Sequence, residues 1–390
     1  MALNTVSSDR LSTNVKNTNF TAAEKQDLTD DIKPLLGSSG GGNKNLIING
    51  AYLIAQRNVD ATGVSANGFA TVDRFTADQS GTDEYIEQHQ VDVSSGTTPY
   101  TLGFRKAFQV KNGNQSSGAG TSDRVTIAYK IEAQDMANSG WNYNSASSFV
   151  TFSYWVKSSV AQNFYNRFKS ADSPSQAYVT ETGSLSADTW TKITKTISGN
   201  SNIVFNNDNG EGLEITWELF RGTSQTGTRP LNAWATSDNN TRTPDQTSTW
   251  YTTNDATFEI TGVQLEVGSV ATDFEHLSFA DELRRCQRYY QVVAEGANHI
   301  IGSVFTVSSY IYSVVDLLVT MRATPTVEVS NFANAFRAYG TSGGVNVNTL
   351  SITGESRNNR VFIEQAGNPG TVASLRCYNA NSKLALSAEL

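Results

Sequence analysis

Three stretches of the chain alternate between apolar and mainly polar residues, and this period-two pattern limits the fold more than any other feature. The stretches cover residues 125–131, 150–156 and 215–219. Alternation places the apolar side chains of each stretch on one face, which is typical of a β-strand with one buried face. Such a face must be covered by a second sheet. The sequence therefore predicts a mainly β chain in which residues 45–277 form an antiparallel β-sandwich of the jelly-roll type.

A change of phase marks a distortion in one further predicted strand. In the segment 258–267, apolar residues occupy positions 258 and 260 and then positions 263, 265 and 267. The shift of one residue falls at Gly262, and one extra residue in a strand is what defines a β-bulge. Turns rich in glycine and asparagine, at 112–120 and 206–212, separate the predicted strands.

The pattern changes at Ser278, where helical spacing replaces alternation. Ser278 can cap a helix that has Asp281 at its third position, and apolar residues then recur at positions 279, 283, 286 and 290. We expect a bridging helix over residues 278–291, with Cys286 packed in the core rather than reactive. The remaining residues, 292–390, return to strand-like runs and predict a second, smaller β-domain.

The N-terminal residues differ from the rest of the chain. Thr21 and Glu24 form a T-x-x-E capping box, and Leu28 and Ile32 follow at helical spacing. We expect a short helical segment within residues 1–36, although a loosely ordered tail fits the same residues equally well. Residues 37–44 are rich in glycine and serine and are expected to be a flexible linker.

The charge of the chain limits its partners. The formal net charge is −8, and the sequence has no basic face of the kind that nucleic-acid binding needs. The longest basic cluster, Arg284, Arg285 and Arg288, lies in the predicted helix and is interpreted as a solvated face. The N-terminus lacks a signal-peptide pattern, and no window approaches the roughly 18 apolar residues of a membrane span. We expect synthesis in the cytosol and no membrane insertion.

Motifs that would indicate an enzyme are weak. The three histidines and two cysteines lack metal-ligand spacing, and the two GxSxG matches, at 37–41 and 340–344, lack the strand and helix that flank a nucleophile elbow. Distant strands could still supply the two opposed carboxylates of a glycosidase. The strand carboxylates, which we interpret as solvated and outward-facing, are Glu214, Glu218, Glu259 and Glu266. His276 is interpreted as a structural hydrogen-bonding residue, and we expect no enzymatic activity and no catalytic residue.

Aromatic residues outside the predicted core could bind a saccharide, because the apolar face of a sugar ring stacks on an exposed aromatic ring. Trp155 stands on the polar face of its predicted strand, whereas Trp217 stands on an apolar face and should be core. The other candidates lie in polar loops or turns. The glycan-binding candidates are Trp141, Tyr143, Trp155, Trp234, Trp250 and Tyr251. For each ring, packing beneath a loop is the alternative.

One polar turn could bind a metal ion. Asp208, Asn209 and Glu211 offer the oxygen ligands that Ca²⁺ takes in proteins. The alternative is a turn in which these side chains cap their own backbone. We expect no cofactor, with Ca²⁺ as a weak candidate.

Five segments of the chain carry a distinctive pattern, and the longest is FEITGVQLEVGSVATDFEHLSFADELRRCQRYYQ at 258–291. The others are NLIINGAYLIAQRNV at 45–59, FSYWVKS at 152–158, DNGEGLEITWEL at 208–219 and MRATPTV at 321–327. Together and in this order, they resemble a family of bacteriophage tail-fibre and receptor-binding proteins that contain a jelly-roll domain similar to carbohydrate-binding modules. Asp273 stands where the family would have proline, and residues after about 330 match no known pattern.

The resemblance implies a homotrimeric fibre in the virion tail. Residues 1–36 would attach it to a phage tail or baseplate protein, and the virion would adhere through it to a host surface glycan or outer-membrane component. Two alternatives stay open: a structural adaptor between fibre and baseplate that does not touch the host, and a glycan-depolymerising tailspike.

Overall fold

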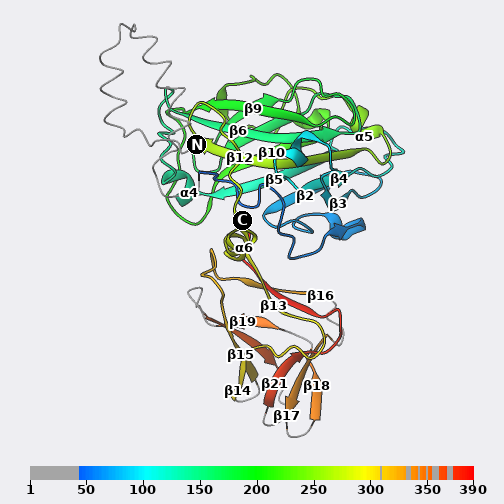
Figure 1. Ribbon diagram of the computed structural model, residues 1–390, viewed down its shortest axis with the longest axis vertical. Helices are drawn as coiled ribbons and strands as arrows, with labels where there is room; N and C mark the ends of the chain where they lie inside the picture. Colours follow the sequence, from blue (N-terminus) through cyan, green and yellow to red (C-terminus); the bar gives the residue numbers. More distant parts are fainter. Residues whose placement is uncertain are drawn as a thin grey trace, which may run out of the picture. The chain divides into compact units, whose positions relative to one another are not determined.

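The computed structural model describes residues 44–307, 310–330, 335–340, 343–347, 350–353, 360–366 and 372–390 (Figure 1). Within it, Lys44–Leu390 is one compact unit. The predicted helical segment at 1–36 and all of the predicted linker except Lys44 lie outside the described residues. No helix among the described residues is long and apolar enough to cross a membrane.

Two six-stranded antiparallel sheets form the first part of the described chain, as the alternation predicts (Figure 1). One sheet has the order β1 (Asp60–Ala61), β3 (Glu87–Asp92), β4 (Lys106–Lys111), β12 (Thr257–Val267), β6 (Phe149–Ser158) and β9 (Thr191–Ser198). The other has the order β11 (Trp234–Thr236), β8 (Gln176–Glu181), β7 (Tyr165–Ser170), β10 (Glu211–Arg221), β5 (Arg124–Glu132) and β2 (Phe75–Ser80). The connections contain short helical turns: η1 (Gly63–Ala66), α3 (Thr98–Thr101), α4 (Ala133–Ala137), η2 (Thr223–Gln225) and α5 (Thr249–Thr252).

The inner faces of the two sheets share one hydrophobic core. Trp217 of β10 is 1% exposed, and its ring packs against Phe152 and Tyr154 of β6 at centroid distances of 5.7 and 5.8 Å. Phe75 of β2 packs against the same tryptophan at 6.1 Å. The alternating residues thus point inward from both sheets, and the predictions of a β-sandwich and of Trp217 in its core are confirmed.

The predicted bulge in β12 is also confirmed. The pairing of β12 with β6 shifts register between Thr261 and Gln264, and Gly262 has a φ of +63°. A side chain is strained at that φ, whereas glycine is not. In addition, a Cβ atom at Gly262 would lie 2.5 Å from Cζ of Phe104. The bulge therefore requires glycine for two independent reasons.

The predicted helix is present as α6 (Phe279–Gln287), and Ser278 caps it by accepting a hydrogen bond from the Asp281 amide at 3.2 Å. Cys286 is fully buried, as expected. The helix is shorter than predicted, because Tyr290 already belongs to the next strand. The Phe279 side chain is 59% exposed and does not share the buried face.

The basic cluster on this helix is not a fully solvated face. Arg288 follows α6 and forms an ion pair of 2.7 Å with Glu132, which is 0% exposed. Tyr289 donates a hydrogen bond to the same carboxylate at 2.5 Å. Glu132 ends β5, so these contacts fix the end of the helix against the sandwich. The interpretation of Arg288 as solvated is therefore wrong, since its partner is a buried carboxylate.

Strands after α6 form three further sheets, as the strand-like runs predict. β13 (Tyr290–Glu295) pairs with β22 (Lys383–Ser387), which also pairs with β16 (Thr326–Ser330). The second sheet has the order β14 (Ser303–Val307), β15 (Tyr310–Asp316), β20 (Arg360–Ala366) and β19 (Ser351–Thr353); the third has β18 (Gly343–Asn346), β17 (Phe336–Gly340) and β21 (Val372–Cys377). These strands bury a core of their own around Phe336, Leu375 and Leu384.

Candidate functional site

A cavity of about 460 Å³ lies on the outer face of the first sheet. Trp155 of β6 stands between Lys192 of β9 and Thr261 of β12 in the strand register. Its ring is partly exposed, while the neighbouring residues Tyr154 and Val156 point into the core. We call this cavity the aromatic pocket; its lining includes Phe104, Ser153, Trp155, Lys192, Phe274 and His276.

The bulge in β12 shapes one wall of the aromatic pocket. Phe104 is 2% exposed, and its ring lies where a side chain at Gly262 would otherwise stand. The ring meets Phe274 edge-on at 4.9 Å and His276 at 5.1 Å. Since only glycine leaves this space open, the bulge is what allows the aromatic rings to approach the sheet.

The segment 268–278 also lines the pocket, through Thr272, Asp273, Phe274 and His276, and is held by two buried polar side chains of β12. Glu266 accepts hydrogen bonds from the Thr272 amide at 2.8 Å, from the Thr272 hydroxyl at 2.6 Å and from Gln264 at 2.9 Å. Gln264 in turn accepts from the Glu275 amide at 2.9 Å. A buried carboxylate needs such partners. Glu266 therefore fixes the segment that carries Phe274 and His276.

His276 has the structural hydrogen bond that the sequence predicts. Its Nε2 lies 3.0 Å from the carbonyl oxygen of Leu102. A carbonyl can only accept, so Nε2 carries a proton and donates it. Gly103 follows directly, and a Cβ there would lie 3.1 Å from the same Nε2. This bond ties the segment 268–278 to the turn after α3 and closes the rim of the pocket.

The partly exposed Trp155 packs against an apolar cluster that includes Phe104, and polar groups line the same pocket. The Ser153 hydroxyl lines the pocket on the same strand, and the Lys192 and Asp273 side chains are exposed at its edge. A ring face beside hydroxyl, ammonium and carboxylate groups can hold a molecule that has both apolar C–H faces and hydroxyls.

Three of the predicted glycan-binding rings are buried, which corrects the expectation that they are open to a ligand. Trp141 is 3% exposed, Trp250 0% and Tyr251 1%. Tyr251 stacks on Phe220 at 4.2 Å and donates a hydrogen bond to Asp123. The indole of Trp250 donates to the Thr257 carbonyl at 3.1 Å. The loops that carry these three rings are polar in sequence, but the rings pack into the core and hold the loops against it.

Tyr143 and Trp234 are partly buried and do not line the aromatic pocket. Tyr143 packs edge-on against Phe205 at 4.8 Å. The Trp234 indole donates to the Ser198 carbonyl at 2.7 Å, and its ring lies 5.4 Å from Tyr178. Of the six candidates, the structure thus brings Trp155 alone into the aromatic pocket.

The strand carboxylates are not solvated as interpreted from the sequence. Glu218 is 0% exposed and paired with Arg221 at 2.6 Å. Glu259, 6% exposed, pairs with Lys157 at 2.8 Å, and Glu266 is 4% exposed. Glu214 is partly buried, 3.6 Å from Arg167. A loop covers Glu266, and a basic side chain pairs with each of the other three carboxylates. Period-two alternation reveals neither kind of partner.

The candidate calcium ligands have protein partners. Asp208 accepts from the Gly210 amide at 2.8 Å, as a self-capping turn does. Asn209 donates to the Arg322 carbonyl. Glu211 pairs with Lys130 at 2.8 Å and with Lys169 at 3.4 Å. Burial raises the pKa of its carboxyl, but the two lysines together outweigh burial and hold that pKa below its ordinary value. Within the described residues, no three His, Cys, Asp or Glu side chains gather as a metal site.

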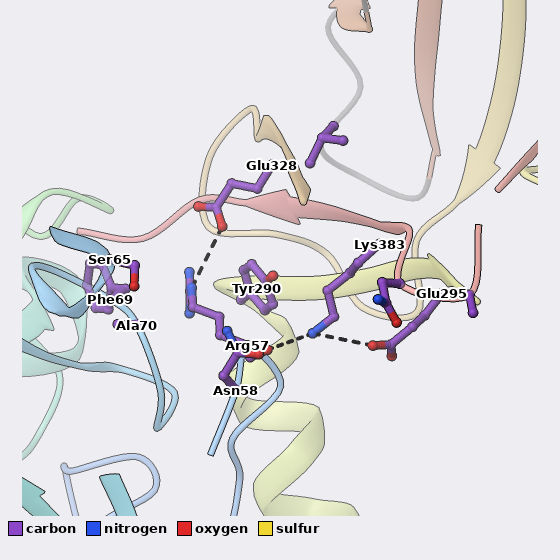
Figure 2. A pocket seen from close by; sticks show the side chains of 12 residues that line it. Arg57, Asn58, Ser65, Phe69, Ala70, Tyr290, Glu295, Glu328 and Lys383 are labelled. Atoms are coloured by element: carbon purple, nitrogen blue, oxygen red, sulfur yellow. Dashed lines mark hydrogen bonds and ion pairs between the residues drawn. The ribbon is translucent and has the colours of Figure 1, made fainter. Parts of the chain in front are cut away.

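A second cavity, of about 650 Å³, lies where the sandwich meets the strands after α6 (Figure 2). We call it the junction pocket; its lining includes Arg57, Asn58, Phe69, Tyr290, Glu328 and Lys383. The sequence did not predict this site, because some of its residues lie more than 300 positions apart in the chain and they share no motif.

No protein-family model matches the chain, and no curated protein matches its sequence. Solved structures do show similarity at low identity. They include the enzymatically active domain of bacteriophage CBA120 tailspike protein 4, with 10% identity and a TM-score of 0.32 over 58% of this chain and 22% of that one.

Carbohydrate-binding modules are also among the similar structures. The N-terminal cellulose-binding domain of Cellulomonas fimi β-1,4-glucanase C has 13% identity and a TM-score of 0.27, over 54% of this chain and 97% of that one. The family 11 module of a Clostridium thermocellum cellulosomal cellulase has 12% identity and a TM-score of 0.24, over 55% and 99%. At these values none of the similarities assigns this chain to a family.

Proposed function

We propose that this protein binds a saccharide through the aromatic pocket and serves as the receptor-binding protein of a phage tail fibre. The observation that carries the proposal is the position of Trp155, a partly exposed ring that faces outward from a sheet into a cavity lined by both aromatic and polar side chains. The volume lies within the range of small-molecule sites, which is about 300–1,000 Å³.

The chemistry of the aromatic pocket suits a pyranose ring. The apolar C–H face of the sugar stacks on Trp155, and this removes apolar surface of both groups from water. The hydroxyl of Ser153, the ammonium of Lys192 and the carboxylate of Asp273 supply donors and acceptors for the sugar hydroxyls. In this role the protein holds its ligand without transforming it.

The second part of the proposal, the tail-fibre role, rests on the resemblance of the sequence to phage tail-fibre proteins. Three copies joined as a homotrimer would present three pockets at high effective concentration, so weak single sites would give durable attachment to a host surface. Residues 1–36 would join the fibre to the phage tail or baseplate. Light scattering on the full chain tests the trimer, for which the mass is three times the chain mass of 42.2 kDa.

The pocket itself is tested by titrating the full-length protein with fragments of host surface polysaccharide. We expect Trp155→Ala to weaken saccharide binding at least tenfold, because the stacking surface is lost. Tyr85→Ala is the matched control, since Tyr85 is 49% exposed and lies outside the pocket. Unchanged affinity in the Trp155 variant, or an equal loss in the Tyr85 variant, would refute the role of the pocket.

Two further assays distinguish the alternative functions. New reducing ends after incubation with intact polysaccharide would identify a depolymerising tailspike. Labelled protein that fails to adhere to host cells would favour a structural adaptor.

A further inference from the structure

One edge of the Arg57 guanidinium in the junction pocket has no hydrogen-bond acceptor. Arg57 is 7% exposed, and its Nη1 donates to Glu389 at 3.3 Å. Its Nε and Nη2 have no hydrogen-bond partner. Buried donors without acceptors destabilise a folded protein. We propose that the junction pocket is a second binding site, in which Arg57 takes the carboxylate of an acidic saccharide such as a uronic acid.

The unused edge has the geometry of carboxylate recognition. Nε and Nη2 lie on the same side of the planar guanidinium, and two parallel N–H donors there match the two oxygens of a carboxylate. Lysine offers no such fork. The unpaired edge is buried, and its two donors match a planar, bidentate acceptor.

Two aromatic rings hold this fork in place. The guanidinium carbon lies 3.7 Å from the ring centroid of Tyr290 and 5.2 Å from that of Phe69. In Figure 2, the Arg57 side chain lies between these two residues and reaches toward Glu328. Because Tyr290 belongs to β13 and Phe69 to the sandwich, the arginine is fixed from both sides of the junction.

In the absence of a ligand, Glu328 is the carboxylate nearest to the unpaired edge of Arg57, but it does not form a hydrogen bond with it. Its Oε2 lies 3.7 Å from Nε of Arg57, beyond hydrogen-bond distance, and its side chain is 44% exposed. The pair is therefore weak on the side of Glu328, whose carboxylate is half in solvent and makes no hydrogen bond with the buried Arg57. A ligand carboxylate can displace Glu328 into solvent and form the short bidentate pair that Glu328 does not form.

The other charges of the junction pocket favour a single negative charge and a polar body. The Lys383 ammonium donates to the backbone carbonyls of Gln56 and Arg57 at 2.5 and 2.8 Å, so its hydrogen bonds hold the backbone beside the pocket. Glu295 and Glu328 repel any anion, and they repel a dianion such as phosphate more strongly than a single carboxylate. Asn58 and Asn381 line the pocket and can bond hydroxyl groups. The combination fits a monocarboxylate sugar.

Binding of glucuronate, glucose and inorganic phosphate to the full-length protein tests this site by calorimetry. We expect saturable binding of glucuronate and at least tenfold weaker binding of glucose and phosphate. Arg57→Lys keeps the positive charge but removes the fork, so it should weaken glucuronate binding at least tenfold. Glu328→Gln removes the competing carboxylate and should strengthen it severalfold, and this variant leaves the buried Arg57–Glu389 pair intact.

The variants also separate this site from the aromatic pocket. Trp155→Ala should leave glucuronate binding unchanged, since Trp155 does not line the junction pocket. The proposal is overturned if the wild-type protein shows no saturable glucuronate binding, if phosphate binds as well as glucuronate, or if Arg57→Lys retains full affinity. Unchanged affinity in Glu328→Gln would overturn the displacement step. A loss in Trp155→Ala would assign the ligand to the aromatic pocket instead.

Discussion

Asp73 shows how burial changes the chemistry of a single residue. It is 0% exposed, and burial raises the pKa of its carboxyl to about 6, although hydrogen bonds from Gln56 lower it. The folded chain therefore binds a proton at Asp73 more tightly than the unfolded chain, where the carboxyl has its ordinary pKa of 3.8. Above about pH 4 the unfolded state loses this proton first. The contribution of Asp73 to the free energy of unfolding thus falls as the pH rises to about 6 and is constant above that.

Asp73→Asn removes this pH dependence. The free energy of unfolding of the variant, minus that of the wild type, should rise by roughly 2–3 kcal/mol between pH 4 and pH 7, because one pKa unit corresponds to about 1.4 kcal/mol. Urea denaturation across this range measures the difference. The variant also loses a hydrogen-bond acceptor, but that loss is the same at every pH. Asp92→Asn, whose side chain is 82% exposed, is the control and should show no such rise; parallel curves for wild type and Asp73→Asn would contradict the account.

At the scale of the elements, periodicity predicts what each strand buries but not what covers its other face. The alternation around Trp217 and the phase shift at Gly262 are local patterns, and both predictions are confirmed. The burial of Glu266 could not be predicted, because its covering segment, 268–278, has no pattern of its own. A carboxylate on the polar face of a strand looks the same in sequence whether water or a loop satisfies it.

The bulge in β12 can be tested by two glycine substitutions with the same backbone strain. Gly63 and Gly262 have φ values of +62° and +63°, but a Cβ at Gly63 meets nothing within 4 Å. Gly63→Ala should cost about 1–2 kcal/mol of unfolding free energy from strain alone. Gly262→Ala should cost more, and it should weaken saccharide binding because Phe104 must move. Equal losses of stability, or full saccharide affinity in Gly262→Ala, would show that the bulge does not shape the pocket.

At the scale of the whole molecule, the sequence predicts the order of the parts better than it predicts the sites. Trp155 could be predicted from the sequence, because it is a large aromatic residue at a position that belongs to the polar face of its strand. Trp250 and Tyr251 could not be excluded, since their burial depends on loops that fold back onto the sandwich. Arg57 gave no signal, because its partners Tyr290, Glu328 and Glu389 follow it by more than 230 residues. Long-range pairing of this kind depends on how the strands after α6 pack against the sandwich.

The most direct test of the central claim is a crystal structure of the full-length protein with a bound fragment of host surface polysaccharide. The account predicts a sugar ring stacked on the face of Trp155, with its hydroxyls toward Ser153, Lys192 and Asp273. A neutral sugar bound at another place, with Trp155 uncovered, would contradict it.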